Sequence, residues 1–150
     1  MMMGEGTGME GSPGGVRARV RFDYKGVRRP NRFLLGSKDP MEVASEQRER
    51  EAILLQKVPI QGIRIEDIDI SFDSFKVNDP VTGEETAYAP VQLTVDADSV
   101  EDLARFTMRN EFRTIDILEP DQLCLTNRDM GRLLYRVNEE MKSSMGTRQQ

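Results

Sequence analysis

The stretch Val16-Arg17-Ala18-Arg19-Val20-Arg21-Phe22 alternates strictly between apolar and basic side chains. Successive side chains of a β-strand point to opposite faces, so this period of two predicts a half-buried strand over residues 16–22. We expect its apolar side to face the core and its three arginines to form one row on the other side.

A helix and a hairpin are expected after this strand. Tyr24–Lys38 is rich in turn formers and predicts an extended loop, with a helix from Asp39 to about Gln56. Asp39 is expected to cap this helix, with Glu42 completing a capping box and Ile53, Leu54 and Leu55 among its core residues. Ile63–Val77 then predicts a strand with a bulge near Glu66, where the parity of the apolar residues changes. Turn formers at 78–85 join it to an antiparallel strand over 86–95.

The last third of the chain predicts two further helices. Ser99 is expected to cap the first, with Asp102 at its third position, and this helix should end near Asn110. A strand over 112–118, a turn over 119–122 and a short returning strand over 123–126 should follow. The final helix has the clearest periodicity and should end near Ser143. Its expected apolar stripe consists of Met130, Leu133, Leu134, Val137 and Met141.

This order of elements predicts an α+β fold, namely a ferredoxin-like split β-α-β sandwich (β-α-β-β-α-β) with an additional short strand and a C-terminal helix. The expected organisation is a disordered tail rich in glycine and methionine over 1–15, one domain over 16–143 and a polar tail over 144–150. The domain begins with a basic arm over 16–32.

Composition excludes several classes of chemistry. The 150 residues are 37% hydrophobic and 31% charged, as in globular proteins, and they include no histidine and a single cysteine. Ser-His and Cys-His nucleophile pairs and histidine metal ligands are therefore absent. No cofactor fingerprint or membrane-spanning stretch is found, so we expect no cofactor, no membrane association and a cytoplasmic location, and we lean against an enzyme.

Charge is distributed unevenly along the chain. Residues 16–32 contain seven basic residues and one aspartate, a net +6, although the whole chain carries −5. Such an arm can bind a polyanion, or it can lie against acidic residues of its own fold or of a second subunit. In the first case the ligand would be a nucleic acid or a nucleotide. The ligand-binding residues would then be Arg17, Arg19, Arg21, Arg28, Arg29 and Arg32.

An acidic row in the strand that begins at Ile63 is a candidate partner for the basic arm within the same fold. Asp67, Asp69 and Asp73 share one side of that strand, and pairing with the first strand would place them opposite the arginines. With Asp116, Asp67 and Asp69 could instead form a metal-dependent phosphoryl-transfer site. Carboxylates that alternate along one strand point in parallel, however, so we expect no metal and prefer a solvated face.

Two short motifs resemble those of PilZ domains, which bind cyclic di-GMP. Arg28-Arg29-Pro30-Asn31-Arg32 contains R-x-x-x-R, and residues 69–74 are similar to D-x-S-x-x-G. The resemblance implies a β-barrel and a guanine nucleotide ligand. Ser74 stands in place of the motif's glycine, and a predicted helix lies where that barrel has strands. The chain is therefore not assigned to that family.

The remaining candidates are interpreted as packing residues. Cys124 lies between two leucines and has no basic neighbour, and Met130 and Met141 fall on a helical stripe. The function that this sequence favours is a non-enzymatic protein-interaction domain, acting as a regulatory or assembly component. Its expected partner is another protein or a second copy, bound through the arginine row or the open sheet face.

Overall fold

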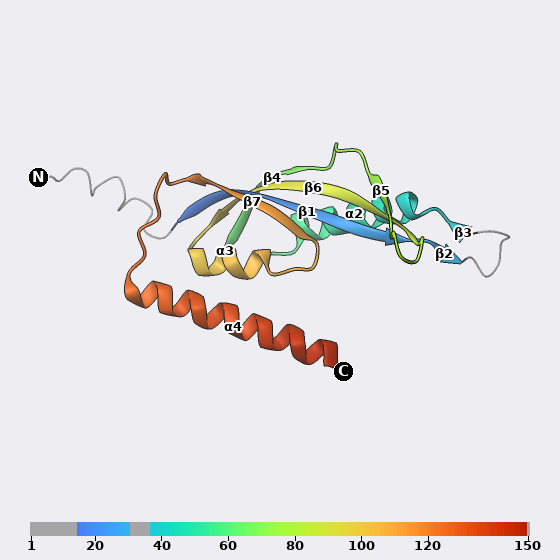
Figure 1. Cartoon of the computed structure of the whole chain (residues 1–150). Helices are drawn as coiled ribbons and strands as arrows, with labels where there is room; N and C mark the ends of the chain where they lie inside the picture. The colour runs from blue at the N-terminus through green and yellow to red at the C-terminus, as the bar shows by residue number, and fades with distance from the viewer. Residues whose placement is uncertain (1–14, 31–36, 150) are drawn as a thin grey trace, which may run out of the picture.

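The computed structural model of the chain describes residues 15–30 and 37–149. These residues form an α+β fold in which an open antiparallel sheet of five strands is accompanied by three helices (Figure 1). An open sheet is not the barrel that PilZ motifs would imply. The predicted N-terminal tail lies outside the described residues except for Gly15.

The strand that opens the fold lies in the middle of the sheet. β1 (Val16–Val27) extends beyond the predicted end at Phe22 and pairs antiparallel with both β6 (Glu85–Ala97) and β7 (Phe112–Glu119). β4 (Ile63–Asp69) flanks β6 on its other side, which gives the strand order β4-β6-β1-β7, and β5 (Phe75–Asn78) also pairs with β6. The predicted loop over 24–38 is thus partly wrong, because β1 and the small pair β2 (Arg29–Pro30) and β3 (Ser37–Lys38) occupy much of it.

The core lies on one face of this sheet. Alternate residues of β1 and β6, such as Val20, Phe22 and Leu93, are completely buried. Both α2 (Pro40–Lys57) and α3 (Val100–Thr107) contribute to the same cluster, α2 through Leu55 and α3 through Phe106. The predicted alternation in residues 16–22 is confirmed. The opposite sheet face is left to the polar side chains.

Helix α2 differs from the prediction at both ends. The Asp39 side chain makes no capping hydrogen bond and instead lies 3.6 Å from Lys76 Nζ, so the predicted capping box is wrong. Ile53 and Leu54 were expected in the core but are 51% and 50% exposed. The reason is geometric, because only one side of a helix faces the sheet, and Leu55 and Ala52 already occupy that side.

The predicted hairpin is confirmed, although its first arm is interrupted. The register shifts between Ile65 and Asp67, which confirms the bulge predicted near Glu66. Residues 70–74 leave the ladder, so the expected continuous strand over 63–77 becomes β4 and β5. Asp69 accepts hydrogen bonds from the backbone amide and hydroxyl of Ser71 at this point, a local arrangement that competes with strand pairing.

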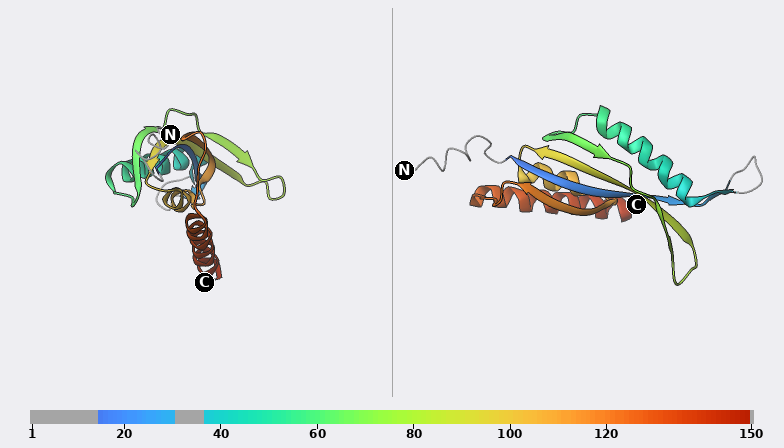
Figure 2. Two further views of the ribbon diagram at one scale, coloured as in Figure 1. Left: turned by 90° about the vertical axis from the view of Figure 1, so that its left-hand side faces the viewer. Right: turned by 90° about the horizontal axis from the view of Figure 1, so that it is seen from above.

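The C-terminal third contains the largest departure from the prediction. Ser99 caps α3 as predicted, its hydroxyl accepting a hydrogen bond from the Asp102 amide at 3.1 Å. Residues 123–126 do not form a strand, and Cys124 is exposed rather than packed. They lead into α4 (Asn127–Gln149), which continues beyond the predicted end near Ser143. Figure 2 shows α4 outside the layers of the sheet, with α3 next to it.

Candidate functional site

The predicted arginine row lies on the sheet face that the helices leave open. Arg17 stands between Asp96 of β6 and Glu119 of β7 in the register, and Arg19 stands between Thr94 and Asp116. The expected pairing of this row with the aspartates of β4 is wrong, because β6 lies between the two strands. Acidic residues on β6 and β7 are the direct neighbours instead.

Arg17 is engaged by carboxylates of its own chain. Its Nε donates to Glu66 Oε1 at 2.8 Å, and its Nη1 lies 3.8 Å from Glu119 Oε2. The hydrogen bond and the negative charge of Glu66 raise the pKa of the Arg17 guanidinium further above its ordinary value. These contacts cross the sheet on its open face, where they join the edge strand β4 to β1 and β7.

Arg21 binds a buried carboxylate. Asp23 is only 3% exposed, and it accepts hydrogen bonds from Arg21 Nε at 2.8 Å and from Arg113 Nε at 3.2 Å. The Arg113 guanidinium also lies 5.0 Å from the centre of the Tyr88 ring. Removing one partner of such a buried carboxylate is costly, so this cluster has a clear role in holding β1 against β7.

The remaining arginines of the predicted ligand set are not gathered into one site. Arg28 Nη2 donates to Glu85 Oε1 at 3.1 Å. Arg19 is exposed and has no ion pair within residues 15–30 and 37–149. Arg32 and the side chain of Arg29 lie outside the described part, so the full six-residue set is not brought together there.

The carboxylates of the metal hypothesis lie on opposite edges of the sheet. Asp67 and Asp69 are on β4 and Asp116 is on β7, with β6 and β1 between them. Three strand spacings separate the two edges, roughly 14 Å, which is too far for one ion. No group of three potential ligands that could hold a metal is found among the described residues. The structure therefore contradicts a metal site built from these three aspartates.

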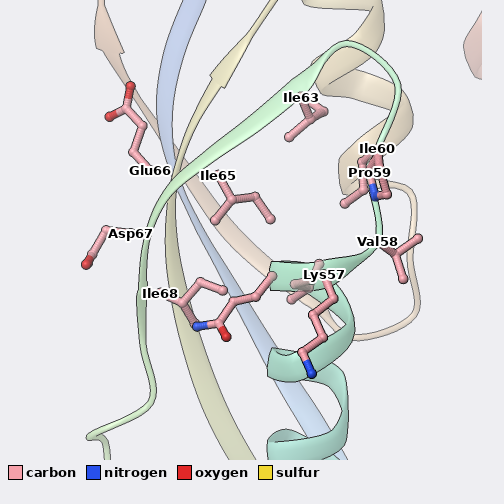
Figure 3. Close-up of a pocket in the computed structure, with 11 residues that line it drawn as sticks. Lys57, Val58, Pro59, Ile60, Ile63, Ile65, Glu66, Asp67 and Ile68 are labelled. Carbon is pink, nitrogen blue, oxygen red and sulfur yellow. The ribbon is translucent and has the colours of Figure 1, made fainter.

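A groove lies along the outer edge of β4, where the predictions placed no site. Its volume is about 510 Å³, and it is lined by the end of α2, residues 58–60 and β4. Ile65 and Ile68 point into it, whereas Glu66 and Asp67 point away (Figure 3). The bulge explains how Ile65 and Ile68, which differ in parity, face the same side.

Helix α4 carries an exposed apolar surface. Leu133, Arg136, Val137 and Glu140 are its partly buried residues towards α3, where Arg136 pairs with Glu101 at 3.2 Å. The other described side chains from residue 127 to residue 145 are exposed, and four apolar ones fall within one narrow sector of the helix, which we call the α4 stripe. They are Met130 at 43% exposure, Leu134 at 56%, Met141 at 54% and Met145 at 51%.

The exposure of this stripe corrects the expectation that Met130 and Met141 belong to the core. The helical periodicity was real, but α3 has only 8 residues and covers one side of a 23-residue helix. Sequence periodicity shows that a helix has an apolar face, without showing how much of that face the chain itself covers.

Comparison with known proteins adds no family assignment. Neither a protein-family model nor a curated protein matches the sequence. Within the described ranges, every helix is too short or too polar to cross a bilayer.

Proposed function

We propose that this chain is a small non-enzymatic domain that works through protein contact, as a regulatory or assembly component, and that it self-associates. The α4 stripe is the observation that carries the proposal. It leaves four apolar side chains between 43% and 56% exposed along one side of α4, and a cluster of exposed apolar side chains marks a candidate interaction site.

The ion pairs of the arginines indicate which surface would bind a partner. Arg17 and Arg21 already bind carboxylates of the same chain, so a partner would have to displace Glu66 or Asp23 to reach them. The α4 stripe has no such competitor. We therefore propose association through apolar contact rather than through the arginine row.

We also propose that the four long strands and the helices α2 and α3 form a ferredoxin-like split β-α-β arrangement. Two features support this interpretation. β1 lies between β6 and β7 with β4 outermost, and both helices contribute to one core cluster. In this interpretation α4 is an addition outside the sandwich, which is consistent with a role in contact.

Light scattering on the full chain tests the function. Between about 5 and 200 µM we expect the particle mass to rise from 17.1 kDa towards a multiple of it. Because apolar association is not screened by salt, the mass should hold when salt is raised, and Arg19→Glu should leave it unchanged. A chain that stays monomeric throughout overturns self-association. A mass that falls with salt and with Arg19→Glu assigns association to the arginine row instead.

A polyanion ligand is the second candidate, favoured by the exposure of Arg19 and Lys25 on the open sheet face. It predicts binding of labelled single-stranded RNA, duplex DNA or a guanine nucleotide that weakens steeply between about 50 and 200 mM salt. Combining Arg19→Ala and Lys25→Ala should abolish that binding. Unchanged affinity in the double variant would remove this candidate.

A further inference from the structure

β4 is an edge strand whose outer side is only partly covered. Within the described ranges it pairs with β6, and the segment before it covers only its first residue, where the Ile63 amide donates to the Ile60 carbonyl oxygen at 3.1 Å. The backbone groups of successive residues point alternately to the two sides of a strand, so the backbone of Ile65 points outward like that of Ile63. After the bulge, Ile68 has the same orientation. No strand of the described sheet lies on this side to pair with them.

The groove of about 510 Å³ lies directly beside this open edge. Ile65 and Ile68 point into it, and the end of α2 and residues 58–60 form the opposite wall (Figure 3). A strand added to β4 would direct every second side chain toward the groove and the others toward the open sheet face. The edge and the groove therefore fit an extended segment that forms main-chain hydrogen bonds with β4 and packs apolar side chains over the two isoleucines.

The open sheet face is acidic along β4. Asp67 is exposed, points away from the groove and forms no ion pair with another described residue. Asp69, two residues further on, accepts hydrogen bonds from Ser71 that hold its pKa below the ordinary value, so it is ionised at neutral pH. Arg19 stands two strands away in the same cross-strand row as Asp67 and has Asp116 beside it. Both aspartates of β4 therefore leave negative charge on this side of the edge.

The nearest cations do not balance this charge, because each of them lies beside two carboxylates. Arg64 is 2.7 and 2.8 Å from its two partners, and Arg17 is 2.8 and 3.8 Å from its own; these partners are Asp96, Asp98, Glu66 and Glu119. Lys57 lies across the groove, at the end of α2. An added strand would therefore meet negative charge on its open-face side and apolar side chains on its groove side.

Charge selects among the possible occupants of this edge. Two β4 strands from two copies of the chain would bring their aspartates together, and like charges opposite one another in a strand pair are destabilising. Residues 1–14 contain Glu5 and Glu10 and no basic residue, so the N-terminal segment has the wrong charge. The occupant that fits is a segment of another protein in which basic and apolar residues alternate.

We propose that β4 binds an extended segment of a partner protein as an added strand, with its apolar side chains over Ile65 and Ile68 and its basic side chains beside Asp67 and Asp69. Main-chain hydrogen bonds supply the affinity, and the alternation of side chains supplies the specificity. No residue of α4 lines this groove, so the inference goes beyond the proposed self-association and does not depend on it.

Fluorescence anisotropy of the full chain with a short labelled peptide of alternating lysine and valine tests the inference. We expect saturable binding, which Asp67→Lys should weaken about fivefold because an exposed ion pair is lost and a like charge takes its place. Asp116→Lys makes the same change of charge on β7, at the other edge of the sheet, and as the matched control it should leave the affinity unchanged. The same peptide with an N-methylated backbone cannot pair with a strand edge and should not bind.

Amide hydrogen exchange followed by NMR locates the added strand, and we expect the Ile65 and Ile68 amides to exchange more slowly when the peptide is bound. No binding, binding of the N-methylated peptide, or weaker binding in Asp116→Lys but not in Asp67→Lys would overturn the inference. A chain that binds the peptide but stays monomeric in light scattering would overturn self-association and leave this inference in place. Both variants alter exposed side chains, and circular dichroism checks that each is folded.

Discussion

Replacing Gly26 by alanine should strongly destabilise the fold, because β1 passes close to the start of α2 at this position. An added Cβ would lie 2.8 Å from Ala44 Cα and closer still to the Ala44 nitrogen and the Pro40 carbonyl oxygen. These are backbone atoms, so no change of rotamer relieves the clash and α2 must move. Overpacking a core costs about 1 to 3 kcal/mol, and we expect about 3 kcal/mol here because backbone obstructs the methyl group. For a chain of this length the melting temperature should fall by roughly 6 to 12 °C.

Gly131→Ala in α4 is the matched control for this prediction. A Cβ there meets nothing within 4 Å, and alanine is better than glycine inside a helix by about 0.5 to 1 kcal/mol. The same methyl group should therefore stabilise one site and destabilise the other. Thermal and urea unfolding followed by circular dichroism measure both. A Gly26→Ala chain as stable as the original would refute the close approach of α2 to β1.

Four further predictions concern Tyr24, Asp79 and the carboxylates of β4 and β7. The hydroxyl of Tyr24 is buried without a hydrogen-bond partner among the described residues, so Tyr24→Phe should raise stability by about 1 kcal/mol, measured by urea unfolding; a loss of stability would show a bond that this structure lacks. Burial also raises the pKa of Tyr24. The folded state therefore favours the protonated hydroxyl, and the stability gained from this preference is present below the unfolded-state pKa and is lost as the pH rises through the folded-state pKa. The Tyr24→Phe chain should therefore lose less stability above about pH 10 than the original. Hydrogen bonds from the Val81 and Thr82 amides hold the pKa of Asp79 below its usual value, so the stability that they contribute is present at neutral pH and lost as the pH falls through the folded-state pKa. Carbon-detected NMR should find Asp79 titrating below an ordinary aspartate, and an ordinary midpoint would contradict the turn geometry. Millimolar Mg²⁺ should leave the melting temperature unchanged, since the carboxylates of β4 and β7 are on opposite edges; a clear rise would require a site elsewhere in the chain.

Local sequence patterns correctly predicted the features that depend on a few neighbouring residues. The alternation around Val20 identified a half-buried strand, the parity change near Glu66 identified a bulge, and Ser99 identified a helix start. Each of these signals is local, because it depends on backbone geometry over a few residues. Their agreement with the structure follows from that locality.

The sequence-based predictions were wrong where contacts between distant parts of the chain determine the structure. The neighbour of β1 could not be read from the arginine row, because acidic residues occur on β4, β6 and β7 alike. Asp39 has the residue type of a cap, but Lys76 from β5 lies beside its carboxylate. The strand predicted over 123–126 has suitable residues and no strand beside it in the described sheet.

The candidate surfaces illustrate the same limit. The stripe containing Leu134 and Met141 is visible as a helical period in the sequence, and that period predicts a core position because an apolar face normally meets its own domain. Its exposure depends on the short length of α3, which contacts only one side of α4. The groove at Ile65 and Ile68 depends on where α2 ends relative to the sheet edge. A local sequence pattern predicts neither how much of α4 is covered by α3 nor where α2 ends relative to the sheet edge.

Coupling between two spin labels tests the central claim of association through the α4 stripe most directly. The exposed Cys124 precedes α4 and can carry a nitroxide in the otherwise unaltered chain. Self-association brings two labels into one particle, so pulsed electron paramagnetic resonance should find dipolar coupling between them. Leu134→Ser should remove this coupling, whereas Val81→Ser, at a turn residue that is 90% exposed, should not. Unchanged coupling in the Leu134→Ser chain, or no coupling at concentrations where light scattering finds dimers, would contradict association through the α4 stripe.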